Sequence, residues 1–104
     1  RRFTDAVSHY ESALRLDPEN ARAHHNLGNV LLESDRLSEA IGHYERACRI
    51  QPGYPEPRRT LGLLLMHLGR PAEALLHLET AVHLSPDDAD IVRALAQAKA
   101  AVRR

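Results

Sequence analysis

The chain has 104 residues, which is enough for one modest domain. Its 14 basic and 14 acidic side chains cancel, so the charge balance argues against a protein that binds nucleic acid or an anionic membrane. Ala, Leu, Arg and Glu are abundant, whereas the aromatic residues are one Phe and three Tyr, with no Trp. This composition favours helices.

The sequence carries no sign of secretion or membrane insertion. Cys48 is the one cysteine, so no internal disulfide can form and a reducing compartment is favoured. The longest apolar run, residues 61–66, is far shorter than the roughly 20 residues needed to span a bilayer. The first residues also lack the apolar stretch of a signal peptide. We therefore expect a cytoplasmic protein without membrane contact.

The first predicted element is a single amphipathic helix over residues 3–15, which ends before Pro18 because proline cannot continue a helix. Its apolar side chains recur at intervals of three and four, as on one helix face: Phe3, Ala6, Tyr10 and Ala13. No helix is predicted before it. We expect this face to be covered by another copy, by preceding residues or by a partner protein.

Two helix pairs follow, over residues 21–54 and 55–88, and a last helix covers residues 89–102. The first pair breaks at Asp35 and the second at Gly69, two residue types that tolerate a left-handed turn. Both pairs show the apolar spacing of amphipathic helices. The chain is therefore predicted to be all-α.

The starts of these helices carry their own signals. Asn20 and Asp88 stand where a side chain is wanted to cap the free N–H groups of a first turn. The junction 51–57 has no such residue, but Pro55 and Pro57 fit only the first turn of a helix. We therefore expect the first helix of the second pair, residues 55–88, to start without a side-chain cap.

A period of 34 residues runs through the chain, as the spacing of Pro18, Pro52 and Pro86 shows. Five further sets keep the same spacing: Ala6, Ala40 and Ala74; Ala13, Ala47 and Ala81; Tyr10, Tyr44 and Leu78; Leu16, Ile50 and Leu84; and Leu27, Leu61 and Leu95, which precede Gly28, Gly62 and Ala96. The small residues predict a close approach of two antiparallel helices, with Tyr44 or Leu78 filling the space beside them. One such hairpin cannot bury its apolar faces alone, so the units are expected to stack.

This pattern resembles the tetratricopeptide repeat, whose 34-residue unit carries W-x2-L-G-x2-Y, then A-x3-F, then P. The matching residues are Leu27-Gly28, Leu31, Ala40, Tyr44 and Pro52 in one unit, and Leu61-Gly62, Leu65, Ala74, Leu78 and Pro86 in the next. The leading Trp is replaced by His24, Arg58 and Val92. The resemblance implies an all-α, right-handed superhelical solenoid of antiparallel helix hairpins.

The resemblance also implies a division of one domain over residues 1–104. Residues 1–20 would be the second helix of a truncated repeat, 21–54 and 55–88 full repeats, and 89–104 a C-terminal capping helix. Lys99 stands in the last helix where Leu31 and Leu65 pack on their partners. A charged residue at that place suits a helix with no further helix beyond it.

In function, the resemblance implies a protein–protein interaction scaffold that holds a peptide or helix of a partner protein in a concave groove, lined by the first helix of each repeat. The positions that the family turns inward include Arg22, His25, Asn26, Asn29, Arg59, Leu63, Met66, Arg93 and Gln97. Among them His25, Arg59 and Arg93 form one row. With the amide groups of Asn26 and Asn29, this row suits a peptide backbone or an acidic side chain.

Narrower family roles do not fit the residues. The carboxylate clamp for chaperone tails requires Lys, Asn and Arg at set positions, of which this chain matches only Asn29. An asparagine ladder like that of O-linked N-acetylglucosamine transferases would include Asn26 but is broken at Thr60 and Ala94. We therefore expect neither a chaperone-tail adaptor nor a transferase.

No enzyme site is predicted. His9, His43 and His77 recur at the 34-residue spacing, but stacked helices lie roughly 10 Å apart. Zinc binds nitrogen at about 2.1 Å, so we interpret these histidines as a repeated semi-buried packing position. Cys48 is expected to be a buried structural thiol, and neither a phosphate loop nor a catalytic triad converges. We expect no catalytic, metal-binding or cofactor-binding residue and no nucleic acid partner.

Two alternatives remain beside the interaction scaffold. The chain could be a self-assembling structural module, a homo-oligomer joined through the uncapped helix that carries Phe3, Ala6, Tyr10 and Ala13. It could also be the substrate-recruiting segment of a larger enzyme. The sequence names neither the partner nor the pathway.

Overall fold

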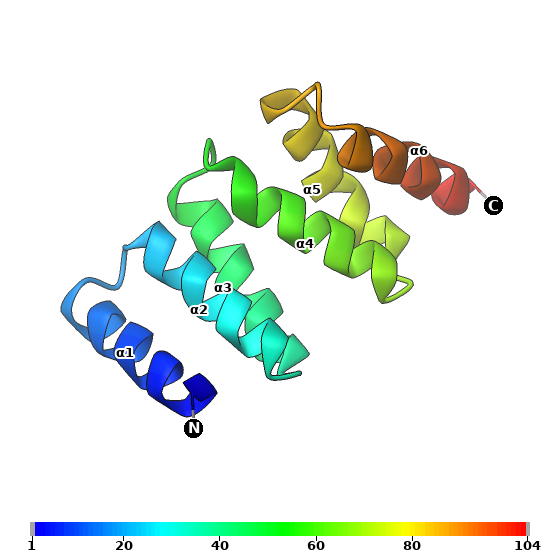
Figure 1. Cartoon of the computed structure of the whole chain (residues 1–104). Coiled ribbons are helices and arrows are strands. Elements are labelled where there is room, and N and C mark those ends of the chain that lie inside the picture. Colours follow the sequence, from blue (N-terminus) through cyan, green and yellow to red (C-terminus); the bar gives the residue numbers. More distant parts are fainter. Residues whose placement is uncertain (1, 104) are drawn as a thin grey trace. The chain divides into compact units, whose positions relative to one another are not determined.

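The computed structural model describes residues 2–103, which form six helices and contain no strand. The helices are α1 (Arg2–Leu16), α2 (Ala21–Glu33), α3 (Leu37–Ile50), α4 (Pro55–His67), α5 (Pro71–Leu84) and α6 (Ala89–Arg103) (Figure 1). They fall into two compact units. Unit 1 ends at Tyr54 and holds α1 to α3, and unit 2 begins at Pro55 and holds α4 to α6. None of the six described helices has the length and apolarity required to cross a bilayer.

In unit 1, α2 packs against both α1 and α3 and runs antiparallel to each of them (Figure 1). The core lies mainly between α2 and α3, where Leu27, Leu31 and Tyr44 are buried, and Ala40 and Ala47 are fully covered. Cys48 is also buried, as predicted. Most of these buried residues belong to the sets that recur every 34 residues, so the positions that repeat in the sequence form the core.

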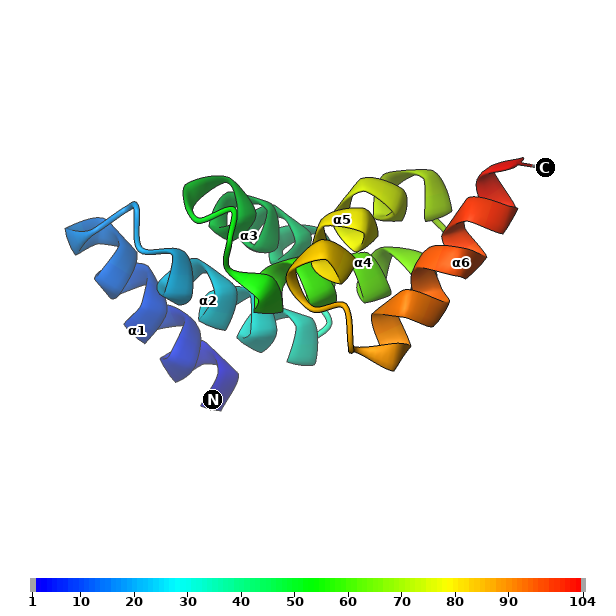
Figure 2. The same cartoon turned by 90° about the horizontal axis from the view of Figure 1, so that it is seen from above.

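In unit 2, α4 and α5 form the corresponding hairpin, and α6 packs on both of them (Figure 2). The buried side chains are Leu61, Leu65, Leu78, Ile91 and Ala98. Lys99 of α6 is exposed.

The predicted close approach of paired helices is confirmed at two glycines. A Cβ atom built on Gly28 would lie 2.7 Å from Cε1 of Tyr44, and one on Gly62 would lie 2.6 Å from Cδ2 of Leu78. Real Cβ atoms do not approach other carbons so closely, so only glycine fits without displacement. Tyr44 of α3 and Leu78 of α5 therefore each pack into a notch, the gap left by the missing side chain of Gly28 or Gly62 on the first helix of the hairpin.

The helix ends follow the signals in the sequence. The side chain of Asn20 accepts a hydrogen bond from the Ala23 N–H at 3.0 Å and caps α2. Asp88 accepts from the N–H groups of Asp90 and Ile91 at 3.1 and 3.4 Å and does the same for α6. Asp35 and Gly69 both have left-handed backbones, with φ of 63° and 72°. The turn inside each hairpin is thus made in the same way by two different residues.

Helix α1 has the open face that its sequence predicts. Phe3 is 44% exposed, and Ala6, Tyr10 and Ala13 are half-buried. Within the described part of α1, Val7 is the one buried residue. The side chains equivalent to Ala6, Tyr10 and Ala13 in α3 are fully covered by α2, so α1 lacks an equivalent cover in the described structure.

Candidate functional site

The four candidate residues of unit 1 lie on one face of α2. Arg22, His25, Asn26 and Asn29 are separated by three or four residues along the helix, so their side chains project to the same side. Arg22 is exposed and the other three are half-buried. The opposite face of α2 carries the buried residues that pack on α1 and α3.

Asn29 is partly used by the protein itself. The buried hydroxyl of Tyr44 donates a 2.6 Å hydrogen bond to Oδ1 of Asn29. Burial of the ring, with the nearby charge of Glu33, raises the pKa of Tyr44 to about 12, so the hydroxyl keeps its proton and remains a donor. The carboxamide of Asn29 is thereby held in one orientation and presents its amino group elsewhere.

His25 is held by the loop that follows α3. A ring nitrogen of His25 lies 3.1 Å from the hydroxyl of Tyr54, and the two rings meet edge to face with centroids 5.4 Å apart. The tilted ring of Tyr44 lies on another side, with a centroid distance of 5.9 Å. His25 is therefore an ordered part of an aromatic cluster at this end of α2.

In unit 2, the candidate arginines belong to an ion-pair network. Arg59 donates to Asp88 at 2.6 Å and to Asp90 at 3.1 Å, and Arg93 lies 3.7 Å from Asp90. The hydrogen bond from Arg59 lowers the pKa of Asp88, so the pair stays ionised. Two positive and two negative charges cancel here. The row of free positive charge that the sequence suggests is thus neutralised from within unit 2.

The remaining candidates of unit 2 differ in character. Leu63 and Met66 are half-buried and three residues apart on α4, whereas Gln97 is exposed on α6. Asp90 brings Arg59 and Arg93 together, but among the described residues no hydrogen bond or ion pair joins Gln97 to either of them. Unit 2 therefore offers apolar surface and a closed charge network where unit 1 offers amides. The assignment of all nine residues to a partner stays a prediction.

A histidine pair that the sequence analysis did not foresee lies beside the α2 core. Nδ1 of His24 is 3.0 Å from Nδ1 of His43, and Nε2 of His24 is 3.0 Å from the carbonyl oxygen of Pro18. The carbonyl can only accept, so His24 carries a proton on Nε2, and the neutral form of this ring has a bare Nδ1. His43 must then donate from Nδ1. The contacts fix the tautomers of both neutral rings.

The two Nδ1 atoms of this pair lie at hydrogen-bond distance. The ring centroids are 5.3 Å apart. This equals the 3.0 Å distance between the two Nδ1 atoms plus one ring radius on each side, so the two nitrogens point at each other and the rings meet edge to edge. Burial, helped by the positive charge of Arg46, lowers the pKa of His43 to about 4. Within residues 2–103, no group of three or more metal-ligating side chains is placed to hold an ion.

The repeated histidines fit the packing interpretation only in part. His43 and His77 are half-buried, whereas His9 is exposed because α1 has no covering helix on that side. In unit 2, Arg58 lies at the position of His24, and its NH1 is 3.0 Å from Nδ1 of His77. A signal in the sequence could have revealed these pairs. The residue at the family's Trp position and the histidine of the next helix are 19 residues apart in both hairpins, as His24 and His43 and as Arg58 and His77.

Comparison with known sequences decides the family. One profile described as tetratricopeptide repeat matches residues 1–55, and a second one matches residues 31–98. The chain belongs to the tetratricopeptide repeat family. No curated protein sequence is significantly similar to it.

Solved structures of tetratricopeptide proteins share the fold. The first TPR of Spaghetti (RPAP3), bound to the HSP90 peptide SRMEEVD, is 18% identical with a TM-score of 0.82 and covers 98% of this chain and 83% of its own. MamA is 23% identical with a TM-score of 0.84, over 92% of this chain and 56% of MamA. YrrB, a TPR protein with an unusual peptide-binding site, is 29% identical with a TM-score of 0.84, over 93% of this chain and 50% of YrrB.

These likenesses, together with the six described helices, confirm the predicted class, an all-α fold of tetratricopeptide helical repeats. The chain spans about half the length of MamA and of YrrB. The division of the chain into one truncated repeat, two full repeats and a capping helix remains a prediction.

Proposed function

We propose that the chain is a protein-interaction module that binds a peptide or short helix of a partner protein, with the polar face of α2 as its main contact. Tetratricopeptide repeats serve as scaffolds for partners and not as catalysts, and the stacked helices offer extended binding surfaces. Nothing in the chemistry of the described residues asks for a catalytic role.

The observation that carries this proposal is the state of Asn26. Its side chain is half-buried on the polar face, yet no hydrogen bond joins it to any other described residue. Half-buried amides are usually satisfied by protein groups or by water. A carboxamide offers both donors and an acceptor, which is the pattern needed to bind the N–H and C=O of an extended peptide.

The surroundings of Asn26 suit the same ligand. Asn29 is oriented by Tyr44, and His25 is fixed by Tyr54, so both would meet a peptide with little loss of side-chain freedom. Arg22 is exposed one turn earlier and has no recorded ion pair with a described residue. It favours an acidic residue in the peptide.

Peptide binding by solved relatives agrees with this proposal. The RPAP3 repeat is bound to an HSP90 peptide, and YrrB has a peptide-binding site. This chain lacks all but Asn29 of the clamp for chaperone tails, so we expect its ligand to be an internal segment. Leu63 and Met66 of unit 2 offer an apolar contact surface of their own.

A displayed library of random peptides tests the proposal. We expect peptides selected on the full chain to bind Asn26→Ala about tenfold more weakly, because each lost hydrogen bond to an otherwise unpaired group costs about 1 kcal/mol or more. Glu45→Ala, an exposed change on α3, is the matched control and should bind as the original chain does. Equal affinity of the Asn26 and Glu45 variants would refute the assignment of this face.

Self-assembly through α1 is a secondary proposal, favoured by the exposure of Phe3 at 44% and of Leu16 at 89%. Large exposed apolar residues on one helix are a common feature of association surfaces. Sedimentation of the chain at high micromolar concentration tests this. A monomer under those conditions would exclude it, and binding through α2 would be unaffected.

A further inference from the structure

We propose that unit 1 has a second binding site, a cleft between α1 and α3 that takes an acidic peptide segment through Arg46 and Arg49. The cleft is floored by the side of α2 that carries His24 and Leu27. Helical periodicity puts this side opposite the face of Asn26. The site is therefore separate from the one proposed above, and neither depends on the other.

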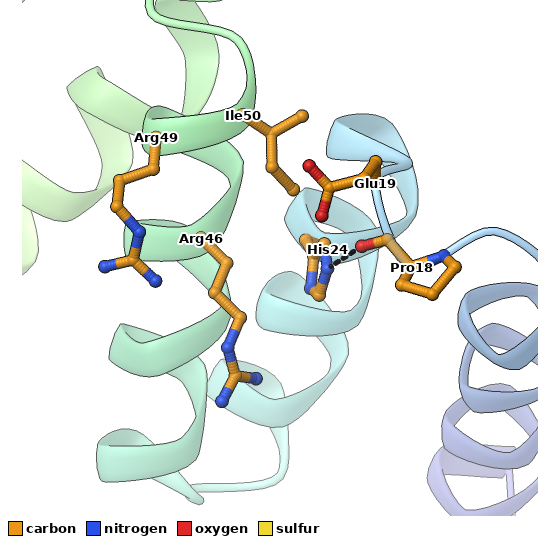
Figure 3. A pocket seen from close by; sticks show the side chains of 6 residues that line it. All are labelled: Pro18, Glu19, His24, Arg46, Arg49 and Ile50. Atoms are coloured by element: carbon orange, nitrogen blue, oxygen red, sulfur yellow. Dashed lines mark hydrogen bonds between the residues drawn. The ribbon is translucent and has the colours of Figure 1, made fainter.

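The cleft consists of two adjoining hollows that share His24 and Arg46. The first has a volume of about 350 Å³ and lies where α3 ends beside the loop after α1. Figure 3 shows Arg46 and Arg49 at successive places along α3, with their guanidinium groups apart from each other and with His24 and Glu19 across from Arg46. The second, of about 380 Å³, continues between α1 and α3. An elongated cavity of this size suits a stretch of peptide better than a single ion.

The two arginines have no evident role in the fold. They are three residues apart on α3, so their like charges repel. No ion pair joins either one to another described residue, whereas Arg36 and Arg70 are both paired with a glutamate at 2.7 and 2.6 Å. Two uncompensated, adjacent cations favour a ligand with carboxylates, which guanidinium groups bind in two-pronged fashion.

The whole lining remains positive when its acids are counted. Glu11 and Glu19 stand against Arg15, Arg46 and Arg49, which leaves a formal charge of about plus one with neutral histidines. The floor, which His24 and Leu27 of α2 form, adds no carboxylate or guanidinium group to this count. The positive charge is thus concentrated on the α3 side.

The lining also selects for apolar side chains in the ligand. The half-buried Leu14 lines the second hollow, above the buried Leu27, and the half-buried Ile50 lines the first. A segment in which acidic and aliphatic residues alternate would place carboxylates at the arginines and aliphatic groups on these leucines and the isoleucine. Unit 2 has no such arginine pair, since Thr80 and His83 occupy the equivalent places in α5.

Fluorescence anisotropy of the full chain with labelled synthetic peptides tests the proposal. The probe is a peptide of alternating aspartate and leucine, and its counterpart has lysine for aspartate. We expect the acidic peptide to bind, the lysine peptide not to bind, and the double variant Arg46→Ala, Arg49→Ala to lose about tenfold or more in affinity. Arg36→Ala, an exposed arginine of unit 1 outside both proposed sites, is the matched control and should retain the affinity, whereas Arg22→Ala reports any binding of the peptide on the α2 face.

A thermal melt accompanies each variant, and the double variant should melt at the same or a higher temperature because a repulsion is removed. Loss of binding with an intact melt supports the cleft. Three outcomes overturn it: affinity that falls with Arg22→Ala but not with the double variant, equal binding of the lysine peptide, or displacement by inorganic phosphate at the peptide's own concentration.

Discussion

The two hairpins of this chain, α2–α3 and α4–α5, pack in the same way with different side chains. Ala40 and Ala74 are fully buried in equivalent slots, and each hairpin has a glycine notch. In the first hairpin a tyrosine fills the notch and its hydroxyl bonds to Asn29. In the second, Leu78 fills it and Leu63 stands where Asn29 would be. The contacting polar pair of the first hairpin, Tyr44 and Asn29, thus corresponds to two apolar residues in the second, Leu78 and Leu63.

The other polar contacts differ between the hairpins in the same paired manner. His24 and His43 share a neutral hydrogen bond, whereas Arg58 and His77 form a charged one over the same 3.0 Å. The arginine version is less well satisfied, since Nε of Arg58 is buried without a hydrogen-bond partner in the described structure. The comparison teaches that small apolar slots are kept between repeats, while polar residues change as contacting pairs.

The largest effect is expected where the two notches are filled with a methyl group. Gly28→Ala should destabilise the chain by about 2 kcal/mol, because overpacking costs about 1–3 kcal/mol and the gain in helix propensity offsets only part of it. Gly62→Ala should cost less, since the methyl group of Leu78 can rotate away more readily than the ring of Tyr44. Urea unfolding measures both free energies.

The chain contains its own control for this pair. Gly42 lies inside α3, and a Cβ atom there would meet nothing within 4 Å. Gly42→Ala should therefore stabilise the chain by about 0.5–1 kcal/mol. If all three alanine variants change the free energy of unfolding in the same direction, close packing is not the reason that glycine is required at positions 28 and 62.

A smaller effect is expected from pH, and it should come from unit 1. Because the folded pKa of His43 is about 4 and its ordinary value is 6.5, the unfolded chain binds the extra proton first as the pH falls. The stability contributed by neutral His43 is thus complete above pH 6.5 and is lost between pH 6.5 and 4. As the side chain is only half-buried, we expect a loss of about 1 kcal/mol.

Urea unfolding at several pH values gives this slope, and two variants assign it. His43→Gln cannot titrate but can still donate to His24, so the slope between pH 6.5 and 4 should flatten. His9→Gln changes the equivalent but exposed position of α1 and should keep the slope. A slope that survives in His43→Gln would place its origin elsewhere in the chain.

The smallest effect is expected at the ion pairs that the two hairpins have in common. Arg36 binds Glu39 and Arg70 binds Glu73 through two hydrogen bonds each, at equivalent starts of α3 and α5. These side chains are about half exposed, and exposed pairs contribute little to stability. Arg36→Ala and Arg70→Ala should melt within experimental error of the parent, equally in both hairpins. A clear drop for either one would show that these pairs are more than surface contacts.

The sequence was sufficient for what depends on local pattern. The 34-residue period, the capping residues Asn20 and Asp88, and the left-handed positions Asp35 and Gly69 could all be predicted because each depends on neighbours along one or two helices. The proposed pairing of Gly28 with Tyr44 followed from size alone. These features need no knowledge of side-chain orientation.

The polar contacts between elements could not be predicted in that way. Arg59 reads as a free charge in the sequence, but it is bound by Asp88, which is 29 residues away and also caps α6. Similarly, His24 reads as a replacement for the family's Trp, while its hydrogen bond to His43 depends on ring orientation and tautomer. The cleft beside Arg46 depends on how α1 lies against α2, and no periodic pattern encodes that.

The glycine notch also constrains how such a repeat can change over generations. A ring at position 44 is tolerated only while position 28 has no side chain, so the fitness effect of a change at either site depends on the residue at the other. This is epistasis between two sites on facing helices. A lineage that acquires alanine at position 28 loses less stability if the tyrosine has already been replaced by a smaller residue, so the order of the two substitutions matters.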